Sequence, residues 1–228
     1  EVLEDFFFAQ KDLEKKKILI TAGPTYEKID PVRFIGNYSS GKMGFALAEA
    51  CAERGAEGTL VAGPVSLKTH HPAIKRIDVE SAGEMYQAAM TAFPSSDAAI
   101  LCAAVADYRP ENASEQKIKR ETEGEMTLHL VPNPDIAASL GAIKREGQVM
   151  VGFALETNDE ATHAEGKLKR KNLDFIVLNS LRDQGAGFRC DTNKITIIDN
   201  AGGVTSYPLK TKREVACDIV NKLVTLLK

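Results

Sequence analysis

Short apolar segments alternate along this chain with longer segments of helical periodicity, and one of them constrains the fold most. Residues 98–105 read AAILCAAV, eight consecutive residues without a charged or hydroxyl side chain. A strand of this composition is typically buried on both faces, inside a parallel sheet that helices cover. Because parallel neighbours need a long crossover connection, helices should alternate with the strands.

The rest of the chain agrees with this alternation. Apolar runs predict further strands at 17–21, 59–62, 74–79, 126–131, 149–154 and 175–178. Helical periodicity predicts helices at 40–54, 81–93, 135–145, 159–171 and 212–227. We therefore expect one α/β domain with a Rossmann-like, mainly parallel sheet flanked by helices.

Three segments stand apart from that sheet. Residues 22–38 should form a long loop, and residues 109–123, polar and without periodicity, a mobile flap. The runs 195–199 and 204–207 flank an Asn-Ala-Gly-Gly turn, which predicts an added antiparallel hairpin. Apolar strand edges are normally covered, so we expect a homodimer through the hairpin and the 26–38 part of the loop.

Charge and composition exclude several classes of protein. The 228 residues carry a net charge of −3, so no global basic field indicates a nucleic-acid partner. Basic residues instead cluster at 15–17, 117–120 and 167–171, which favours small anionic ligands. No apolar run reaches membrane-spanning length. The cysteines lack metal-site and redox-motif spacing and indicate reduced thiols in the cytoplasm: Cys51, Cys102, Cys190 and Cys217.

The segment from Gly36 to Lys42 fits the first seven positions of a phosphate-binding P-loop, GxxxxGK. The eighth position should be Ser or Thr and is Met43, and about fifteen residues separate the glycines from the preceding strand. A true P-loop is therefore disfavoured. A Gly/Ser-rich turn that starts a helix still suits a phosphate, although an ordinary helix capped by Ser39 or Ser40 explains it equally well.

Tyr38 and Lys42 also have the spacing of the catalytic pair of short-chain dehydrogenases. That pair normally follows a glycine-rich turn after the first strand, on a helix in the middle of the chain. Here the first turn contains Pro24, which removes a backbone donor. The dehydrogenase interpretation is weak.

Several polar residues lie where an open α/β sheet binds ligands. Asp107 follows the 98–105 strand and would accept from ribose hydroxyls or lie near a metal, or pair locally with Arg109. Lys117 belongs to a charged run that would ordinarily be a solvated face, unless the flap closes over the strand ends. Lys167 and Lys171 share one helix face and can grip one anion, or face solvent.

Other signals are weaker. Phe153 ends an apolar strand and is either a core residue or a ring that stacks on a base. The four histidines form no metal-binding spacing, and no nucleophile motif is present. From these residues alone the chain is an anion- or nucleotide-binding α/β protein.

Taken together, the motifs resemble bacterial phosphopantothenoylcysteine synthetases over residues 17–228. These are usually the C-terminal half of a bifunctional protein. The string Asn37-Tyr-Ser-Ser-Gly-Lys-Met-Gly44 is the most specific. The others are Ile20–Thr25, Asp30–Phe34, Ala103–Pro110, Lys117–Arg120, Pro132–Ile136, Gly152–Thr157 and Lys167–Asn172. The flap usually reads Lys-x-Lys-Lys in this family, and Arg120 ends it here with the charge kept.

The resemblance implies a ligase of coenzyme A biosynthesis. Its substrates would be CTP, 4′-phosphopantothenate and L-cysteine, with Mg²⁺, an acyl-cytidylate intermediate and a dimer whose partner can contribute to a site. Asn37 would handle the intermediate, and Arg33 would lie in the phosphopantothenate region. CTP binding maps onto Leu101, Cys102, Ala103, Asp107, Lys117, Pro134, Asp135, Ile136, Ala137, Phe153, Lys167 and Lys171.

The resemblance also bears on the start of the chain. Residues 1–16 would be a linker helix from a fused decarboxylase, and FMN would bind to that decarboxylase and not to residues 17–228. A different class remains open, a non-catalytic Rossmann-like nucleotide sensor. Pyrophosphate release in the presence of cysteine distinguishes the two, because a sensor binds without turnover.

Overall fold

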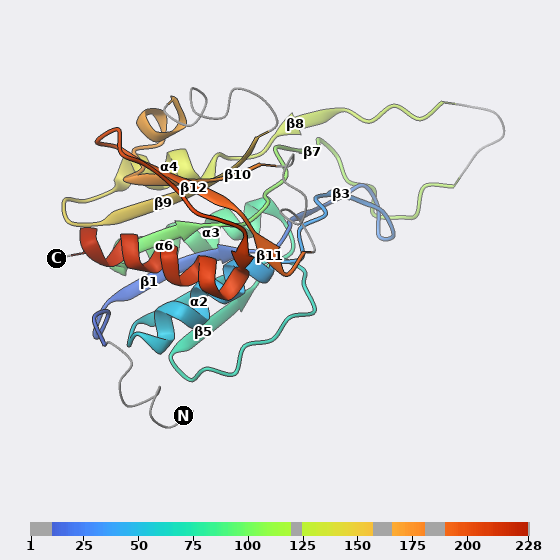
Figure 1. Ribbon diagram of the computed structural model, residues 1–228. Helices are drawn as coiled ribbons and strands as arrows, with labels where there is room; N and C mark the ends of the chain where they lie inside the picture. Colours follow the sequence, from blue (N-terminus) through green and yellow to red (C-terminus); the bar gives the residue numbers. More distant parts are fainter. Residues whose placement is uncertain (1–10, 120–124, 157–165, 181–189, 228) are drawn as a thin grey trace.

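A computed structural model describes residues 11–119, 125–156, 166–180 and 190–227. Its core is a sheet with the strand order β13-β12-β10-β9-β6-β1-β4-β5 (Figure 1). In that order the strands are Val204–Ser206, Ile195–Asp199, Phe175–Ser180, Val149–Glu156, Ala98–Leu101, Lys17–Ala22, Glu57–Ala62 and Ile74–Asp78. The strands from β10 to β5 run parallel, and β12 and β13 extend the sheet as an antiparallel hairpin. The predicted α/β sheet with an added hairpin is confirmed.

Helices cover both faces of this sheet (Figure 1). The helices are α2 (Lys42–Glu53) and α6 (Lys212–Leu226) on one face, and α3 (Ala82–Ala92) and α4 (Ile136–Ile143) on the other. Successive side chains of β1 alternate between the two cores. Ile18 and Ile20 pack in the core under α2 and α6, and Leu19 packs in the core under α3 and α4.

The wholly apolar strand is shorter than the sequence predicts. Ala98, Ala99 and Ile100 are fully buried, as expected, but β6 ends at Leu101. Residues 102–105 continue beside the loop after β1, with the Ala104 amide donating to the Gly23 carbonyl at 2.9 Å. An isolated parallel bridge joins Pro24 to Ala104, but no regular strand pairing extends beyond Leu101. Residues 102–105 are therefore available to line a cavity.

The start of α2 also differs from expectation. The N-cap is Gly41, with φ +77° and no side-chain hydrogen bond to the first turn, so capping by Ser39 or Ser40 is wrong. The Ser39 hydroxyl accepts instead from the Gly41 amide at 3.3 Å. Gly44 sets the close approach of α2 to β1, since a Cβ there would lie 2.5 Å from that of Ala22.

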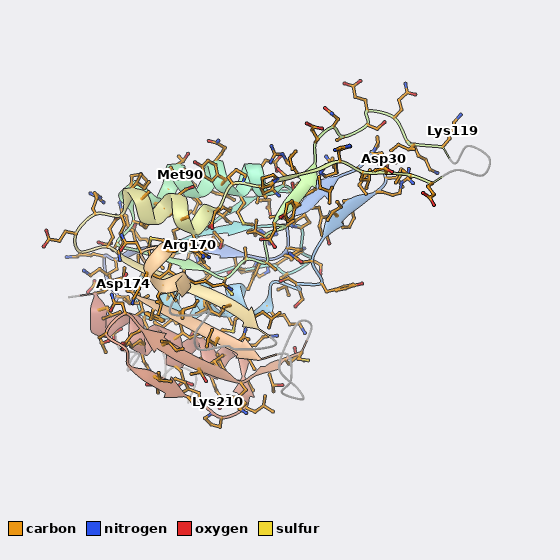
Figure 2. The ribbon with its side chains drawn as sticks, turned by 90° about the horizontal axis from the view of Figure 1, so that it is seen from above. Asp30, Met90, Lys119, Arg170, Asp174 and Lys210 are labelled. Atoms are coloured by element: carbon orange, nitrogen blue, oxygen red, sulfur yellow. The ribbon has the colours of Figure 1, made fainter. Side chains whose placement is uncertain are left out.

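Two short hairpins form an arm that projects from the sheet (Figures 1 and 2), comprising residues 26–36, 108–119 and 125–132. In one hairpin β2 (Tyr26–Lys28) pairs with β3 (Phe34–Gly36), and in the other β7 (Tyr108–Pro110) pairs with β8 (Leu130–Pro132). The expected loop at 22–38 is thus partly β-structure.

Ring stacking stabilises the first hairpin of the arm. The rings of Tyr26 and Phe34 stack with centroids 3.8 Å apart, a contact between residues that show no strand alternation in the sequence. The strand predicted at 126–131 forms only at its C-terminal end, where β8 pairs with β7.

The other predicted helices and strands form within a few residues of their predicted bounds, and the predicted flap begins with part of β7. Residues 166–170 are helical, Lys171 lies in the turn that follows, and residues 159–165 of the predicted helix lie outside the described residues. Residues 1–10 of the proposed linker helix also lie outside, while 12–15 form a turn in which Leu13 is fully buried against the domain. Within the described residues, no helix combines the length and apolarity needed to cross a membrane.

Candidate active site

A cavity of about 600 Å³ lies at the carboxyl ends of the central strands, the position at which open α/β sheets bind ligands. There Thr21 of β1 lies beside Leu101 of β6, which lies beside Gly152 of β9. Nearly all residues predicted to bind CTP line this cavity: Leu101, Ala103, Asp107, Pro134, Asp135, Ile136, Ala137, Phe153, Lys167 and Lys171. We call it the nucleotide cavity.

The N-terminus of α4 forms one wall of the nucleotide cavity. Asp135 caps the helix by accepting from the Ala138 amide at 3.0 Å, and it pairs with Lys171 at 3.0 Å. Burial raises the pKa of Asp135, but the bonds from Ala138 and Lys171 outweigh it and bring the pKa below its usual value. The Asp135 carboxylate is therefore ionised at neutral pH, where it caps α4 and links this helix to Lys171.

Asp107 has a different environment. Its predicted local partner, Arg109, donates instead to the Pro132 carbonyl at 2.7 Å and to the Asn133 side-chain oxygen at 3.3 Å. The local pairing with Arg109 is therefore wrong. Among the described residues the Asp107 carboxylate has no hydrogen bond or ion pair, and it is exposed at the cavity wall. It is available to a ligand or a cation.

A second cavity of about 420 Å³ adjoins the first and contains Asn37, the residue assigned to the intermediate. The two cavities share a wall formed by Ala103, Val105, Asp107, Phe153 and Lys167. The side-chain amide of Asn37 donates to the Ala104 carbonyl at 2.8 Å, which fixes its orientation. We call this the acyl cavity.

Phe153 and Cys102 both border the acyl cavity. Phe153 is partly buried, packs against the core and also borders both cavities, so the two interpretations of this ring are compatible. Cys102 borders the acyl cavity, not the nucleotide cavity. Desolvation raises the pKa of its thiol to about 12, so it remains protonated and is no nucleophile at neutral pH.

Lys117 and Arg33 line neither cavity. Both belong to the arm, where Arg33 pairs with Asp30 and donates to the Ile118 carbonyl at 2.8 Å. Figure 2 shows Asp30 and Lys119 in the arm, away from Arg170 and Asp174, which precede β10. The Arg33 guanidinium holds the pKa of Asp30 well below its usual value, although burial opposes this. Arg33 thus anchors the segment that carries Lys117.

Several polar residues of the acyl cavity are absent from the sequence-based assignment, among them Lys42, Asn179, Asn193 and Lys212. In the sequence Lys42 belongs to the disfavoured P-loop and dehydrogenase patterns and to the Asn37–Gly44 string, none of which gives it a role of its own. Lys212 begins α6, directly after the N-cap Thr211 and within its capping box with Glu214. The sequence does contain a signal that Lys212 is unusual, because lysine is electrostatically disfavoured in the first turn of a helix.

The described side chains fit a metal ion that binds together with the nucleotide better than a metal site built from protein ligands alone. No group of three or more His, Cys, Asp or Glu residues that would hold a metal occurs within the described ranges. Mg²⁺ is commonly held by one or two carboxylates together with substrate phosphates. Asp107 is suitably placed for this, since its carboxylate borders both cavities.

Comparison with known proteins gives the family. A family described as the DNA/pantothenate metabolism flavoprotein C-terminal domain matches residues 13–227. The chain belongs to this family. Its solved relatives include the C-terminal domain of a coenzyme A biosynthesis bifunctional protein CoaBC, with a TM-score of 0.81 and 40% identity over 96% of this chain and 98% of that one. The predicted resemblance and fold are confirmed.

The curated relatives of this family member are longer proteins. Coenzyme A biosynthesis bifunctional protein CoaBC of Vibrio parahaemolyticus serotype O3:K6 (strain RIMD 2210633) is 49% identical over 97% of this chain and 55% of its own length. A protein of an unknown prokaryotic organism named cysteine/cysteine sulfinic acid decarboxylase is 57% identical over 96% of this chain and 60% of its own. The chain therefore spans little more than half the length of the curated relatives it matches.

Proposed function

We propose that this domain joins 4′-phosphopantothenate to L-cysteine with CTP, in coenzyme A biosynthesis. The observation that carries the proposal is the pair of adjoining cavities. The nucleotide cavity is lined by most of the residues assigned to CTP, and the acyl cavity contains Asn37. The wall between the two cavities includes Asp107, Phe153 and Lys167. An acyl-nucleotide intermediate needs such an arrangement, because its two halves occupy two pockets joined at a phosphate. The names of the CoaBC relatives agree with this pathway.

The reaction has two steps. First, a carboxylate oxygen of 4′-phosphopantothenate bonds to the α-phosphorus of CTP, and the bond to pyrophosphate breaks. The cysteine amine then attacks the acyl carbonyl of this acyl-cytidylate, CMP leaves with the bonding electrons, and the amine proton passes to solvent. Lys167, on the shared wall, is placed to stabilise negative charge on the α-phosphate in both steps.

Each cavity wall then has a task. Peptide groups at 134–137 would read the cytosine edge, and the Phe153 ring would stack for about 1 kcal/mol. Asp107 would hold Mg²⁺ on the triphosphate or accept from the ribose. When bound, Mg²⁺ would neutralise phosphate charge. The Asn37 amide would orient the acyl carbonyl.

A steady-state assay tests the proposed function directly. With 4′-phosphopantothenate and cysteine, we expect CTP to support pyrophosphate release with kcat/KM at least about tenfold above ATP, the value of one or two base-edge hydrogen bonds. Mass spectrometry should detect 4′-phosphopantothenoylcysteine. Nucleotide binding without turnover would identify a sensor instead, and equal use of ATP and CTP would contradict the base-reading wall.

The proposal includes a homodimer, since large apolar side chains are exposed along the arm: Val32, Phe34, Tyr108, Met126 and Leu130. The β12–β13 hairpin contributes the exposed Val204. Such surfaces commonly mark a protein interface. This extends the interface proposed for 26–38 and 193–207, and it would bring the arm of one subunit to the partner's cavities.

We expect sedimentation velocity at micromolar concentration to give the mass of a dimer. Val32→Asp should shift the mass toward the monomer and reduce turnover, because it places a charge on an apolar surface that is 60% exposed in the single chain. Ile143→Asp is the matched control, being 41% exposed at the end of α4 and outside the arm. A monomer with full activity would contradict the proposed dimer.

Two further parts of the proposal concern the longer protein. A fused decarboxylase domain would precede this one and would hold FMN, with no FMN contact from the residues described here. We also propose a cytoplasmic location. The free thiols of Cys51, Cys102, Cys190 and Cys217 support it, since thiols stay reduced there.

A further inference from the structure

Lys212 is an unusual residue for the start of a surface helix. It is the first residue of α6, only 8% exposed, and it borders the acyl cavity. Its ammonium donates to the Cys190 carbonyl. Burial lowers its pKa, and the neighbouring Lys42 lowers it further. Burying an ammonium costs free energy, and an anion bound beside it in the cavity would offset part of that cost.

Lys42 reaches the same cavity from another helix. It is the first residue of α2, and its ammonium pairs with Asp191 at 2.5 Å. The Asp191 side chain is 85% exposed, so this pairing is solvated and weak. Three lysines therefore border the acyl cavity, Lys42, Lys212 and Lys167 of the shared wall, with the exposed carboxylates of Asp107 and Asp191 nearby.

The two lysines share an electrostatic disadvantage. Each occupies the first position of its helix, where the positive end of the helix dipole disfavours a cation. The helices α2 and α6 lie on the same face of the sheet (Figure 1). Their first residues, Lys42 and Lys212, border the acyl cavity. An anion in that cavity would be favoured by both ammonium groups and by both helix ends. The walls therefore favour an anionic ligand group.

We propose that the acyl cavity holds the α-carboxylate of the amino-acid substrate, with Lys212 as its principal partner and Lys42 as the second. This inference rests on the proposed function. The attacking amine must come within about 3–3.5 Å of the acyl carbonyl, and that carbonyl is assigned to Asn37 in the same cavity. The α-carboxylate is separated from the amine by one carbon, so it must lie in this cavity too.

The competing anions fit less well. The phosphate of 4′-phosphopantothenate is at the opposite end of that substrate from its reacting carboxylate, so it would lie far from Asn37. Pyrophosphate departs after the first step and leaves the ammonium groups without an anion when the amine attacks. A carboxylate that arrives with the amine is the anion whose arrival coincides with the second step.

The test compares cysteine with cysteamine, which has the same amine and thiol but no carboxylate. In Lys212→Met, kcat/KM for cysteine should fall at least about tenfold relative to that for cysteamine, the loss of one hydrogen bond to a charged group. The loss should appear chiefly as a raised KM for cysteine. Single-turnover formation of acyl-cytidylate without an amine should keep its normal rate. Lys212→Arg should restore part of the preference for cysteine.

Arg213→Met is the matched control, because it removes a cation from the same helical turn. Its guanidinium is 78% exposed and pairs with Glu53, away from the cavity. It should leave the ratio of cysteine to cysteamine unchanged. Lys42→Met should shift the ratio in the same direction as Lys212→Met, by a smaller factor.

Three results would overturn the inference while leaving the proposed function intact. An unchanged ratio in Lys212→Met would exclude a carboxylate contact. Slower acyl-cytidylate formation would assign Lys212 to the triphosphate. A raised KM for 4′-phosphopantothenate, with no change for pantothenate, would assign it to the substrate phosphate. Failure of the wild-type domain to form product with any amine would overturn the proposed function, and the inference with it.

Discussion

Replacing Lys117 by Gln should lower the rate of pyrophosphate release about 10²-fold or more, if Lys117 acts like other groups that stabilise transition-state charge. In the first step negative charge builds on the α-phosphate and on the departing pyrophosphate. A cation directed at those oxygens acts mostly on the transition state, so the effect should appear in kcat. Gln keeps a polar, slightly shorter side chain and removes the charge. Rapid-quench analysis of the first turnover measures this step directly.

The position of Lys117 sharpens the experiment. Within one chain it borders neither cavity, and Ile118 beside it is held by Asp30 and Arg33 of the arm. The Ile118 amide donates to Asp30 at 3.1 Å, and its carbonyl accepts from Arg33 at 2.8 Å. Lys117 therefore reaches a cavity only if the arm moves or if the cavity belongs to a partner subunit.

A mixed dimer separates these two routes. If Lys117 serves the partner's cavity, combining Lys117→Gln chains with Asn37→Asp chains leaves one site with both native groups. Activity should then return to roughly a quarter of the wild-type value when the subunits mix freely in equal amounts. If Lys117 serves its own cavity, no mixed site is complete and activity stays low. A normal first step in Lys117→Gln itself would refute the role under either route.

The nucleotide cavity was the part of the site most accessible from the sequence. Asp107 follows a buried strand, the 134–137 segment starts a helix and Phe153 lies toward the end of a strand. The carboxyl ends of parallel strands meet at one edge of the sheet. Local signals thus located these residues individually, and the family resemblance assigned them to one ligand. The structure places them around one cavity.

Other features depend on contacts that local signals do not contain. The arm hairpin is held by stacking of Tyr26 on Phe34 and by Arg33 bonds to Asp30 and Ile118, none of which follows from strand alternation. Lys212 becomes a cavity residue only because α6 packs beside α2 on the same sheet face. The helices α2 and α6 come from opposite ends of the chain, and the periodicity of neither helix predicts that they pack together.

Replacing Asn37 by Asp should slow the second step about 10²-fold while the first step proceeds, so that acyl-cytidylate accumulates. The native amide donates to the Ala104 carbonyl at 2.8 Å and faces the acyl cavity as a neutral dipole. A carboxylate there would repel the oxyanion that develops when cysteine attacks. It would also oppose the Ala104 carbonyl instead of donating to it. Quenched reactions analysed by mass spectrometry should contain the intermediate.

Asn37→Ala distinguishes added charge from lost orientation. It removes the amide without introducing a carboxylate, so it should slow the second step less than Asn37→Asp and accumulate less intermediate. Equal effects of the two variants would mean that orientation, and not charge, is what Asn37 provides. If Asn37→Asp instead blocks pyrophosphate release and no acyl-cytidylate appears, Asn37 acts on the nucleotide step. The division of the site between the arm lysine and the acyl-cavity amide would then be wrong.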